Sequence, residues 1–147
     1  MRCEILWITI LLATGSAWAA DPVVERQRLE FFETKIRPVL VEHCYKCHSA
    51  SSEKVKGGLL LDTREGIRKG GESGHAVVPK NLDESLLIAA IRYGDEDLEM
   101  PPKEKLPDSV IADFEKWIMM GAPDPRDGKA APFFKPDWAK SKNHWSF

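Results

Sequence analysis

Residues 43–48 read HCYKCH, which places two cysteines and two histidines within six positions. Three kinds of site use such a pattern: a redox-active dithiol, one half of a zinc site, and the C-x-x-C-H signature for covalent attachment of haem. The residues around the motif distinguish these three interpretations.

The residues before the motif predict a helix that runs directly into it. Apolar side chains recur there at steps of three and four residues, as on one face of a helix: Leu29, Phe32, Ile36, Val39 and Leu40. We expect Pro38 to bend this helix or to begin a new turn, and His43 to be a solvent-exposed residue at the helix end. A thioredoxin-like dithiol would instead open a helix that follows a strand, so the redox interpretation is not favoured.

A zinc site is not favoured either. Structural zinc needs four ligands, usually completed by a second pair, and the other histidines, His75 and His144, stand alone. The remaining interpretation is haem attachment. In such a site the thiols of Cys44 and Cys47 bond the porphyrin edge, and His48 binds the iron.

Residues 1–19 have the layout of a secretory signal peptide. Arg2 precedes an apolar run, and the small residues Ala17 and Ala19 suit a cleavage site. An uncleaved N-terminal anchor is the alternative, although the run is short for a membrane span. We expect a periplasmic or secreted protein with no stable membrane span after cleavage. Cleavage also removes Cys3, so both cysteines of the mature chain lie in the motif.

The composition bears on the class of protein. The chain of 147 residues has a formal net charge of −2 and no clustered basic segment, so nucleic-acid binding is not expected. Residues 20–121 are expected to form one domain with a modest core, which is what about 100 residues can provide.

Two helices are predicted after the motif and before residue 100. An apolar run at 59–61 indicates an extended segment, and residues 63–69 follow it as a short helix. A glycine-rich loop then leads to a helix at 81–93, where Asn81 and Glu84 make a capping-box-like start. The expected core face of this helix is Leu82, Leu86, Ala89, Ala90 and Tyr93.

The last helix is expected at 109–120 and should end at Gly121. Its expected core face is Val110, Ile111, Phe114, Trp117 and Ile118. Met119 and Met120, at its end, are interpreted as packing residues.

A second axial ligand would close the coordination of the iron. The downstream candidates are His75, Met100, Met119, Met120 and His144. Met100 is preferred because it lies in a non-helical loop among acidic residues and directly precedes two prolines, which stiffen the chain. Such a loop can hold a weakly basic thioether against iron, whereas a methionine packed into a loop cluster is the alternative.

Three segments of the chain, 31–49, 56–102 and 106–126, resemble in the same order the planctomycete-type cytochrome c domain. That family usually stands at the N-terminus of much larger secreted proteins. The resemblance runs from about Glu25 to Arg126. It implies an all-α, class I cytochrome c-like fold with three to five helices around one covalently bound haem c.

The resemblance also implies roles for four residues. Cys44 and Cys47 match the thioether sites, His48 the proximal iron ligand, and Met100 the distal methionine before a double proline. These roles make the haem iron His/Met-ligated.

Two positions depart from the family pattern. His75 stands where proline is expected and Lys80 where glycine is expected. His75 therefore competes with Met100 as distal ligand, although a surface or propionate-contacting role suits it better. Arg92 could pair with a haem propionate, but a solvated arginine at a helix end is the preferred interpretation.

These features predict an electron-transfer module and not an enzyme, working with redox partner proteins that the sequence does not identify. A haem-based module that binds or senses a small ligand after Met100 leaves is the alternative, and carbon monoxide binding to the reduced protein separates the two. A catalytic haem of the peroxidase kind is not favoured, because no distal acid–base pair is evident.

Residues 122–147 are expected to be a linker or tail. The segment is rich in proline and lysine, yet it carries many aromatic residues for a solvated tether: Phe133, Phe134, Trp138, Trp145 and Phe147. In the resembling family a histidine–tryptophan–aromatic segment opens the next domain. We therefore expect a following domain in a longer chain.

Overall fold

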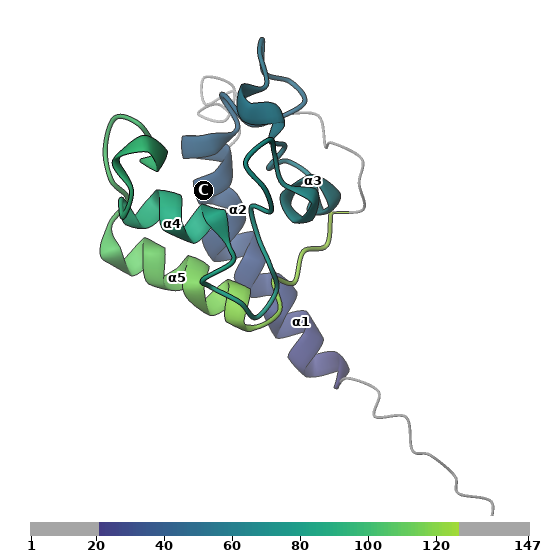
Figure 1. Cartoon of the computed structure of the whole chain (residues 1–147). Coiled ribbons are helices and arrows are strands. Elements are labelled where there is room, and N and C mark those ends of the chain that lie inside the picture. Colours follow the sequence, from purple (N-terminus) through teal and green to yellow (C-terminus); the bar gives the residue numbers. More distant parts are fainter. Residues whose placement is uncertain (1–20, 127–147) are drawn as a thin grey trace, which may run out of the picture.

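The computed structural model describes residues 21–126, and Figure 1 shows them as helices joined by long loops. Across this range the structure has no β-strand, only isolated bridges between Gly71 and Gly74 and between Val78 and Asn81. The predicted all-α fold is confirmed. The predicted signal peptide and the aromatic tail, with His144, lie outside the described residues.

The first helix is continuous but contains two wider turns. It consists of α1 (Pro22–Phe31), the π turn η1 (Phe32–Ile36), α2 (Arg37–Val39) and the π turn η2 (Leu40–Cys44). Asp21 caps its start by accepting a hydrogen bond from the backbone N–H of Val23.

The wider turn η1 lies directly before Pro38. A proline donates no hydrogen bond, and its ring clashes with the carbonyl group four residues earlier, so an extra residue in the preceding turn accommodates it. The Arg37 N–H accordingly bonds to the carbonyl of Phe32, five residues back. Pro38, which was expected to bend the helix or to begin a new turn, is thus accommodated by a wider helical turn before it.

The buried face of the first helix differs partly from the prediction. Phe32, Ile36 and Leu40 are fully buried, whereas Leu29 and Val39 are only partly buried. The π turns explain the difference, because they raise the average number of residues per turn and favour a spacing of four.

The segment after the motif follows the prediction closely. Leu59 has extended backbone, and the Leu61 N–H donates to the His48 carbonyl at 2.8 Å. The short helix α3 (Arg64–Lys69) follows, with the Thr63 hydroxyl accepting from the Gly66 N–H at 2.9 Å. Gly66 must be a glycine here, because a Cβ atom would lie 2.5 Å from the Leu60 carbonyl oxygen.

Helix α4 (Leu86–Arg92) begins later than predicted, with Ser85 as its N-cap. The Asn81 side chain does accept a hydrogen bond from the Glu84 N–H, but in a separate turn before the helix. The Ser85 hydroxyl is bound to the Asn81 carbonyl at 2.6 Å and accepts from the Val78 N–H at 2.9 Å, which places the helix start there.

The predicted core face of α4 is confirmed at Ala90, and Leu82 packs against the core from the turn before the helix, whereas Leu86, Ala89 and Tyr93 are only partly buried. The buried residues are Leu87, Ile88, Ala90 and Ile91. The helix ends at Arg92, one residue before the predicted end, and the residue that follows it, Tyr93, has a left-handed backbone (φ 59°).

Helix α5 (Asp108–Met119) lies beside α4 and packs against the first helix (Figure 1). Its core face is confirmed at Ile111, Phe114, Trp117 and Ile118, with Val110 partly buried. Trp117 joins α5 to the first helix, since its ring centroid is 5.7 Å from that of Phe32.

The end of α5 follows the prediction at Gly121 and departs from it at the methionines. Gly121 has a φ of 96°, and the next N–H, that of Ala122, bonds back to the Trp117 carbonyl. Met119, however, is 53% exposed, so its interpretation as a packing residue is wrong. It occupies the solvent side of the helix opposite Trp117 and Ile118.

Lys80, where the family pattern has glycine, adopts a left-handed backbone with φ 65°. Relief of strain of about 1–2 kcal/mol, less the entropy that glycine loses, should make Lys80→Gly more stable by about 0.5–1 kcal/mol. Urea denaturation of the haem-loaded protein measures this. The matched control, Lys69→Gly in the last turn of α3, should lose about 1 kcal/mol. An equal loss in both variants would contradict the expectation.

The packed domain extends beyond the predicted boundary at Gly121. Ala122, Asp124 and Arg126 are only 2%, 4% and 7% exposed. The segment 122–126 thus belongs to the domain, and a linker can begin only after it. No helix in the described part of the chain is both long and apolar enough to cross a bilayer.

Candidate haem-binding site

The motif residues lie on one tight turn at the C-terminal end of the first helix. Cys44 is the last residue of η2, and its carbonyl accepts hydrogen bonds from the N–H groups of Cys47 (3.1 Å) and His48 (3.0 Å). The turn therefore brings two thiols and an imidazole together on a rigid support. His43, just before it, is solvent-exposed as predicted.

The two cysteines are free thiols and are each partly buried. Burial, with a smaller contribution from the neighbouring Cys47, raises the pKa of Cys44 to about 12. A redox-active dithiol needs the opposite, a cysteine whose pKa is lowered towards neutrality. The redox interpretation gains no support from this environment.

Metal binding by the motif residues alone also lacks support. Within residues 21–126 no group of three or more His, Cys, Asp and Glu side chains is arranged to hold a metal ion. A zinc site made from this motif would need ligands from elsewhere.

His48 is half-buried at the end of the turn. Burial lowers its pKa, with the backbone of Lys56 and Leu59 acting in the opposite direction, so the ring is neutral at pH 7. Its Nδ1 atom is buried near this backbone, without a hydrogen bond of good geometry to any described residue. A neutral imidazole that turns one nitrogen into the protein can present the other to a metal.

The loop after the motif is fastened to it at two points. The Lys56 N–H donates to the Cys47 carbonyl at 3.0 Å, and the Leu61 N–H donates to the His48 carbonyl. Segment 56–61 is thereby held beside the thiols and the imidazole. The residues present fit a covalent haem: two free thiols, a neutral imidazole and an apolar segment alongside.

Met100 is half-buried in a loop that is anchored to α4. Its N–H donates to the Ala90 carbonyl at 3.0 Å, and the Tyr93 hydroxyl donates to the carbonyl of Pro101, the next residue. The short turn η4 (Glu96–Leu98) precedes it. These contacts restrain the backbone on both sides of the methionine side chain.

The competing ligand candidates have other surroundings. His75 is exposed, and its Nδ1 atom lies 2.9 Å from the carbonyl oxygen of Arg68 at the end of α3. Met119 is exposed, and Met120 is half-buried beside Gly121. Arg92, the candidate propionate partner, forms an exposed ion pair with Glu115 at 2.8 Å.

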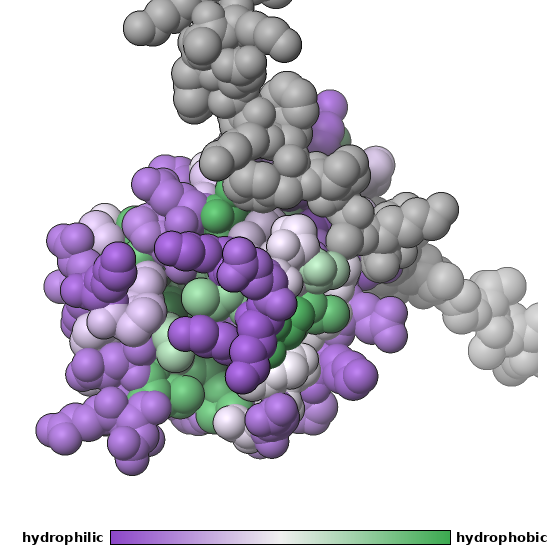
Figure 2. Space-filling view, turned by 90° about the horizontal axis from the view of Figure 1, so that it is seen from above, coloured by the Kyte–Doolittle hydropathy of each residue, from purple (hydrophilic) through white to green (hydrophobic). Residues whose placement is uncertain are grey.

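Figure 2 shows the molecule from the side on which the first helix ends. Hydrophobic residues gather in the middle of this face, and hydrophilic residues surround them. An exposed apolar area of this kind suits a large flat apolar group.

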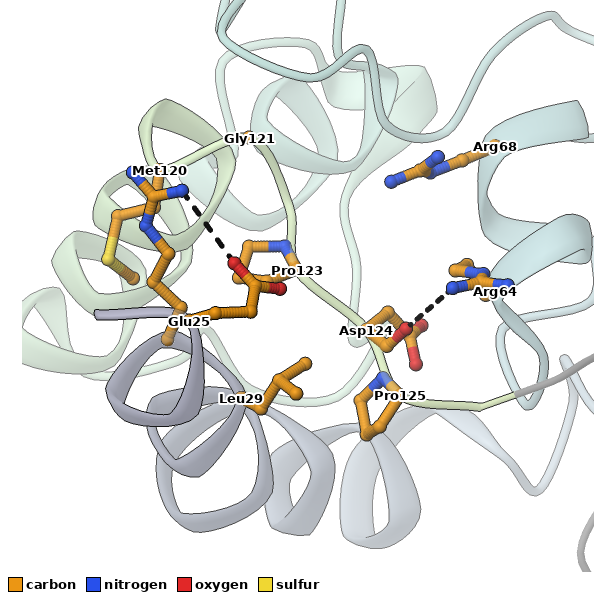
Figure 3. Close-up of a pocket in the computed structure, with 10 residues that line it drawn as sticks. Glu25, Leu29, Arg64, Arg68, Met120, Gly121, Pro123, Asp124 and Pro125 are labelled. Carbon is orange, nitrogen blue, oxygen red and sulfur yellow. Dashed lines mark hydrogen bonds and ion pairs between the residues drawn. The ribbon is translucent and has the colours of Figure 1, made fainter. Parts of the chain in front are cut away.

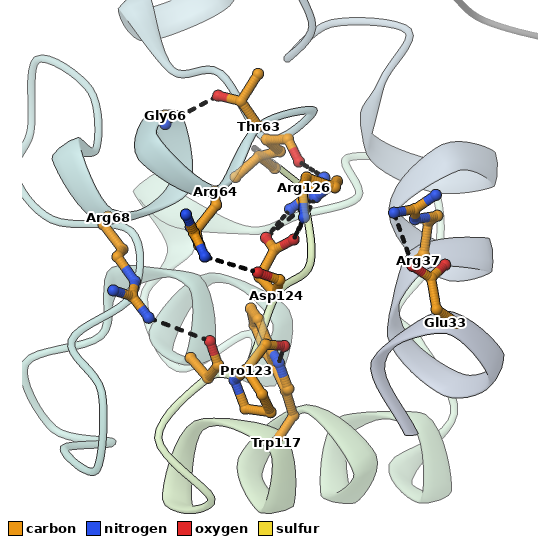
Figure 4. A network of polar contacts seen from close by, with 12 residues as sticks. Glu33, Arg37, Thr63, Arg64, Gly66, Arg68, Trp117, Pro123, Asp124 and Arg126 are labelled. Carbon is orange, nitrogen blue, oxygen red and sulfur yellow. Dashed lines mark hydrogen bonds and ion pairs between the residues drawn. The ribbon is translucent and has the colours of Figure 1, made fainter. Parts of the chain in front are cut away.

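A buried network that the sequence did not predict supports the motif from behind. The Arg126 guanidinium donates to the Asp124 carboxylate, to the Tyr45 hydroxyl (2.6 Å) and to the Leu61 carbonyl (2.7 Å). It also lies 4.9 Å above the Phe32 ring. Figure 4 shows Asp124 and Arg126 facing each other in the segment that follows α5.

Arg126 thus holds together a residue of the motif, the extended segment and the chain after α5. Burial opposes its charge, but hydrogen bonding to Asp124 and the charges of Tyr45 and Asp124 outweigh burial and raise the pKa of Arg126. The only sequence signal for this network is that Asp124 and Arg126 alternate with prolines. Such a pattern is also typical of a linker, which is how the segment was interpreted.

A helical domain whose first helix ends in a C-x-x-C-H turn, with a methionine loop anchored on a later helix, is of the cytochrome c class. Comparison with protein families agrees. Residues 44–104 match the model of the family described as planctomycete cytochrome C, which is the family that the sequence resembles. The resemblance found in the sequence is confirmed, and with it a haem-binding, electron-transfer domain. No curated protein and no solved structure matches the chain.

Proposed function

We propose that this chain is a single-haem c-type cytochrome in which Cys44 and Cys47 hold the haem, His48 is the proximal ligand and Met100 the distal ligand. The observation that carries the proposal is the arrangement of the motif, which places two free, partly buried thiols and the His48 imidazole on one turn at the end of the first helix. Export to the periplasm or the medium, where haem c is attached, is part of the proposal.

The haem, when bound, supplies an iron that accepts and returns one electron. The residues of the chain orient and shield it. His48 presents a neutral imidazole nitrogen, and the hydrogen bonds from Lys56 and Leu61 to the motif keep that ring in place. The anchored backbone around Met100 holds a thioether in position, so the coordination need not change with the oxidation state.

Acidic residues before Met100 give this loop a local negative charge. Asp95, Glu96, Asp97 and Glu99 lie in the loop that ends at Met100. Such a charge favours ferric iron slightly, or it docks a basic redox partner. Of these two roles, docking suits an electron-transfer module better, because the acidic residues would orient the partner protein relative to the haem.

The proposal is tested on the exported, haem-loaded protein by intact mass and by absorption spectra in both oxidation states. A thioether ligand gives ferric haem a weak far-red charge-transfer band. Met100→Ala should erase this band, lower the reduction potential because a thioether favours ferrous iron, and open the iron to carbon monoxide. Met119→Leu, at an exposed position, should change none of these and is the matched control.

Two results would contradict the proposal in different ways. If His75→Ala changes the spectrum and potential while Met100→Ala does not, the distal ligand is His75. If the unmodified reduced protein binds carbon monoxide rapidly at neutral pH, the chain is a module that binds or senses small ligands and not a closed electron carrier.

A further inference from the structure

A cavity lies away from the motif, between the start of the first helix, α3 and the segment after α5. Its volume is about 310 Å³, at the lower end of the range of about 300–1,000 Å³ for small-molecule sites. Figure 3 shows Arg64 and Arg68 reaching into it from α3, opposite Glu25 and Leu29 of α1. No role in the proposed electron transfer requires this cavity.

Two of its arginines are poorly paired. Arg64 and Arg68 are one turn apart on the same face of α3. Arg64 Nη1 donates to the Asp124 carbonyl at 3.3 Å and Arg68 Nη2 to the Ala122 carbonyl at 3.5 Å, and neither has a carboxylate within salt-bridge distance among residues 21–126. A guanidinium carries five N–H donors, so most of theirs remain for a ligand.

The remaining charges leave the cavity positive. Arg28 also lines it, and its only described ion pair is a weak one to Glu25 at 3.9 Å. The Asp124 carboxylate does not compensate, because it is buried and bound to Arg126 at 2.5–3.0 Å. Three guanidinium groups thus face one solvent-exposed carboxylate, in a chain whose net charge is −2.

Part of the cavity lining is apolar, although polar groups make up most of it. The apolar residues are Leu29, Met120, Pro123 and Pro125. A bare inorganic anion would use the guanidinium groups but leave these apolar residues without a contact. A carbon skeleton attached to the anion would cover them.

We propose that this cavity binds a small organic oxyanion, that is, a phosphate, sulfate or carboxylate group on a body about the size of one sugar ring. Arg64 and Arg68 bind the oxyanion with paired N–H donors, the geometry in which guanidinium groups recognise these anions. The body lies on Leu29 and the two prolines. Binding here leaves the haem and its ligands untouched.

The test is calorimetric titration of the full-length haem-loaded protein with glucose 6-phosphate, glucuronate, inorganic phosphate and glucose. Glucose 6-phosphate or glucuronate should bind saturably, inorganic phosphate at least several-fold more weakly, and glucose not at all. The variant Arg64→Gln/Arg68→Gln should weaken binding of the organic anion at least tenfold. Lys69→Gln removes one positive charge from the same helix outside the cavity and should leave the affinity within twofold.

A variant that keeps every charge tests whether the apolar residues of the lining contact the ligand. Leu29→Trp should fill the cavity and weaken binding of the organic anions while leaving that of inorganic phosphate unchanged. Equal affinity for inorganic phosphate and glucose 6-phosphate would overturn the assignment to an organic ligand. Equal losses in Lys69→Gln and Arg64→Gln/Arg68→Gln, or no saturable binding of any anion, would overturn the site itself.

Discussion

The double variant Cys44→Ser/Cys47→Ser should contain no covalently bound haem when it is produced with a haem-attachment apparatus. The serine hydroxyl is too weak a nucleophile to replace the thiol, so both bonds to the porphyrin edge are lost. Intact mass spectrometry should show the chain without the mass of one haem. Lys46→Ser is the matched control, since it introduces serine at an exposed position between the two cysteines and should keep the haem.

His48→Ala should be as damaging as loss of both thiols. It removes the ligand that binds iron in both oxidation states. If the unmodified chain, produced in the same way, carries a disulfide or a zinc ion between Cys44 and Cys47 in place of haem, the proposed function is wrong.

Arg126→Met should reduce the free energy of unfolding by about 3–5 kcal/mol. The reason is the residue left behind, because the buried Asp124 carboxylate, 4% exposed, would keep its charge and lose its partner. The Tyr45 hydroxyl and the Leu61 carbonyl would lose their donor as well. Urea denaturation of the haem-loaded protein in one oxidation state measures the loss.

The matched control is Arg92→Met, which removes the same side chain from an exposed ion pair with Glu115. Exposed pairs contribute little, so this variant should lose less than about 1 kcal/mol. The double variant Arg126→Met/Asp124→Leu should recover part of the loss, since no unpaired charge remains. Equal losses in Arg126→Met and Arg92→Met would show that the buried network does not stabilise the fold.

The sequence predicted best those features that depend on neighbours along the chain. The core face of α5 and its end at Gly121 follow from the helical period and from the freedom of glycine to adopt positive φ. The start of α3 at Thr63 likewise depends on one local hydrogen bond. The motif itself predicted which residues share a turn, because its spacing is local.

Features that depend on distant partners were missed. The start of α4 is set by the contacts of Ser85 with Val78 and Asn81, which overrode the capping signal at Asn81. Arg126 is buried because it meets Tyr45, 81 residues earlier in the chain. From the neighbouring residues alone, Asp124 and Arg126 between prolines are predicted to be exposed to solvent. They are buried because of contacts with distant parts of the chain.

The two π turns in the first helix have a consequence for how the motif is aimed. An α-helix has 3.6 residues per turn, so residues spaced by four drift steadily around its axis. Because each π turn holds an extra residue, this helix averages about four residues per turn over the stretch that contains both. Phe32, Ile36, Leu40 and Cys44 are spaced by four, and the first three are fully buried while the fourth packs against the same core. Residues spaced by four therefore stay on one face of this helix. Deleting one residue from either wide turn would rotate the Cys44 thiol away from the face that packs against the core.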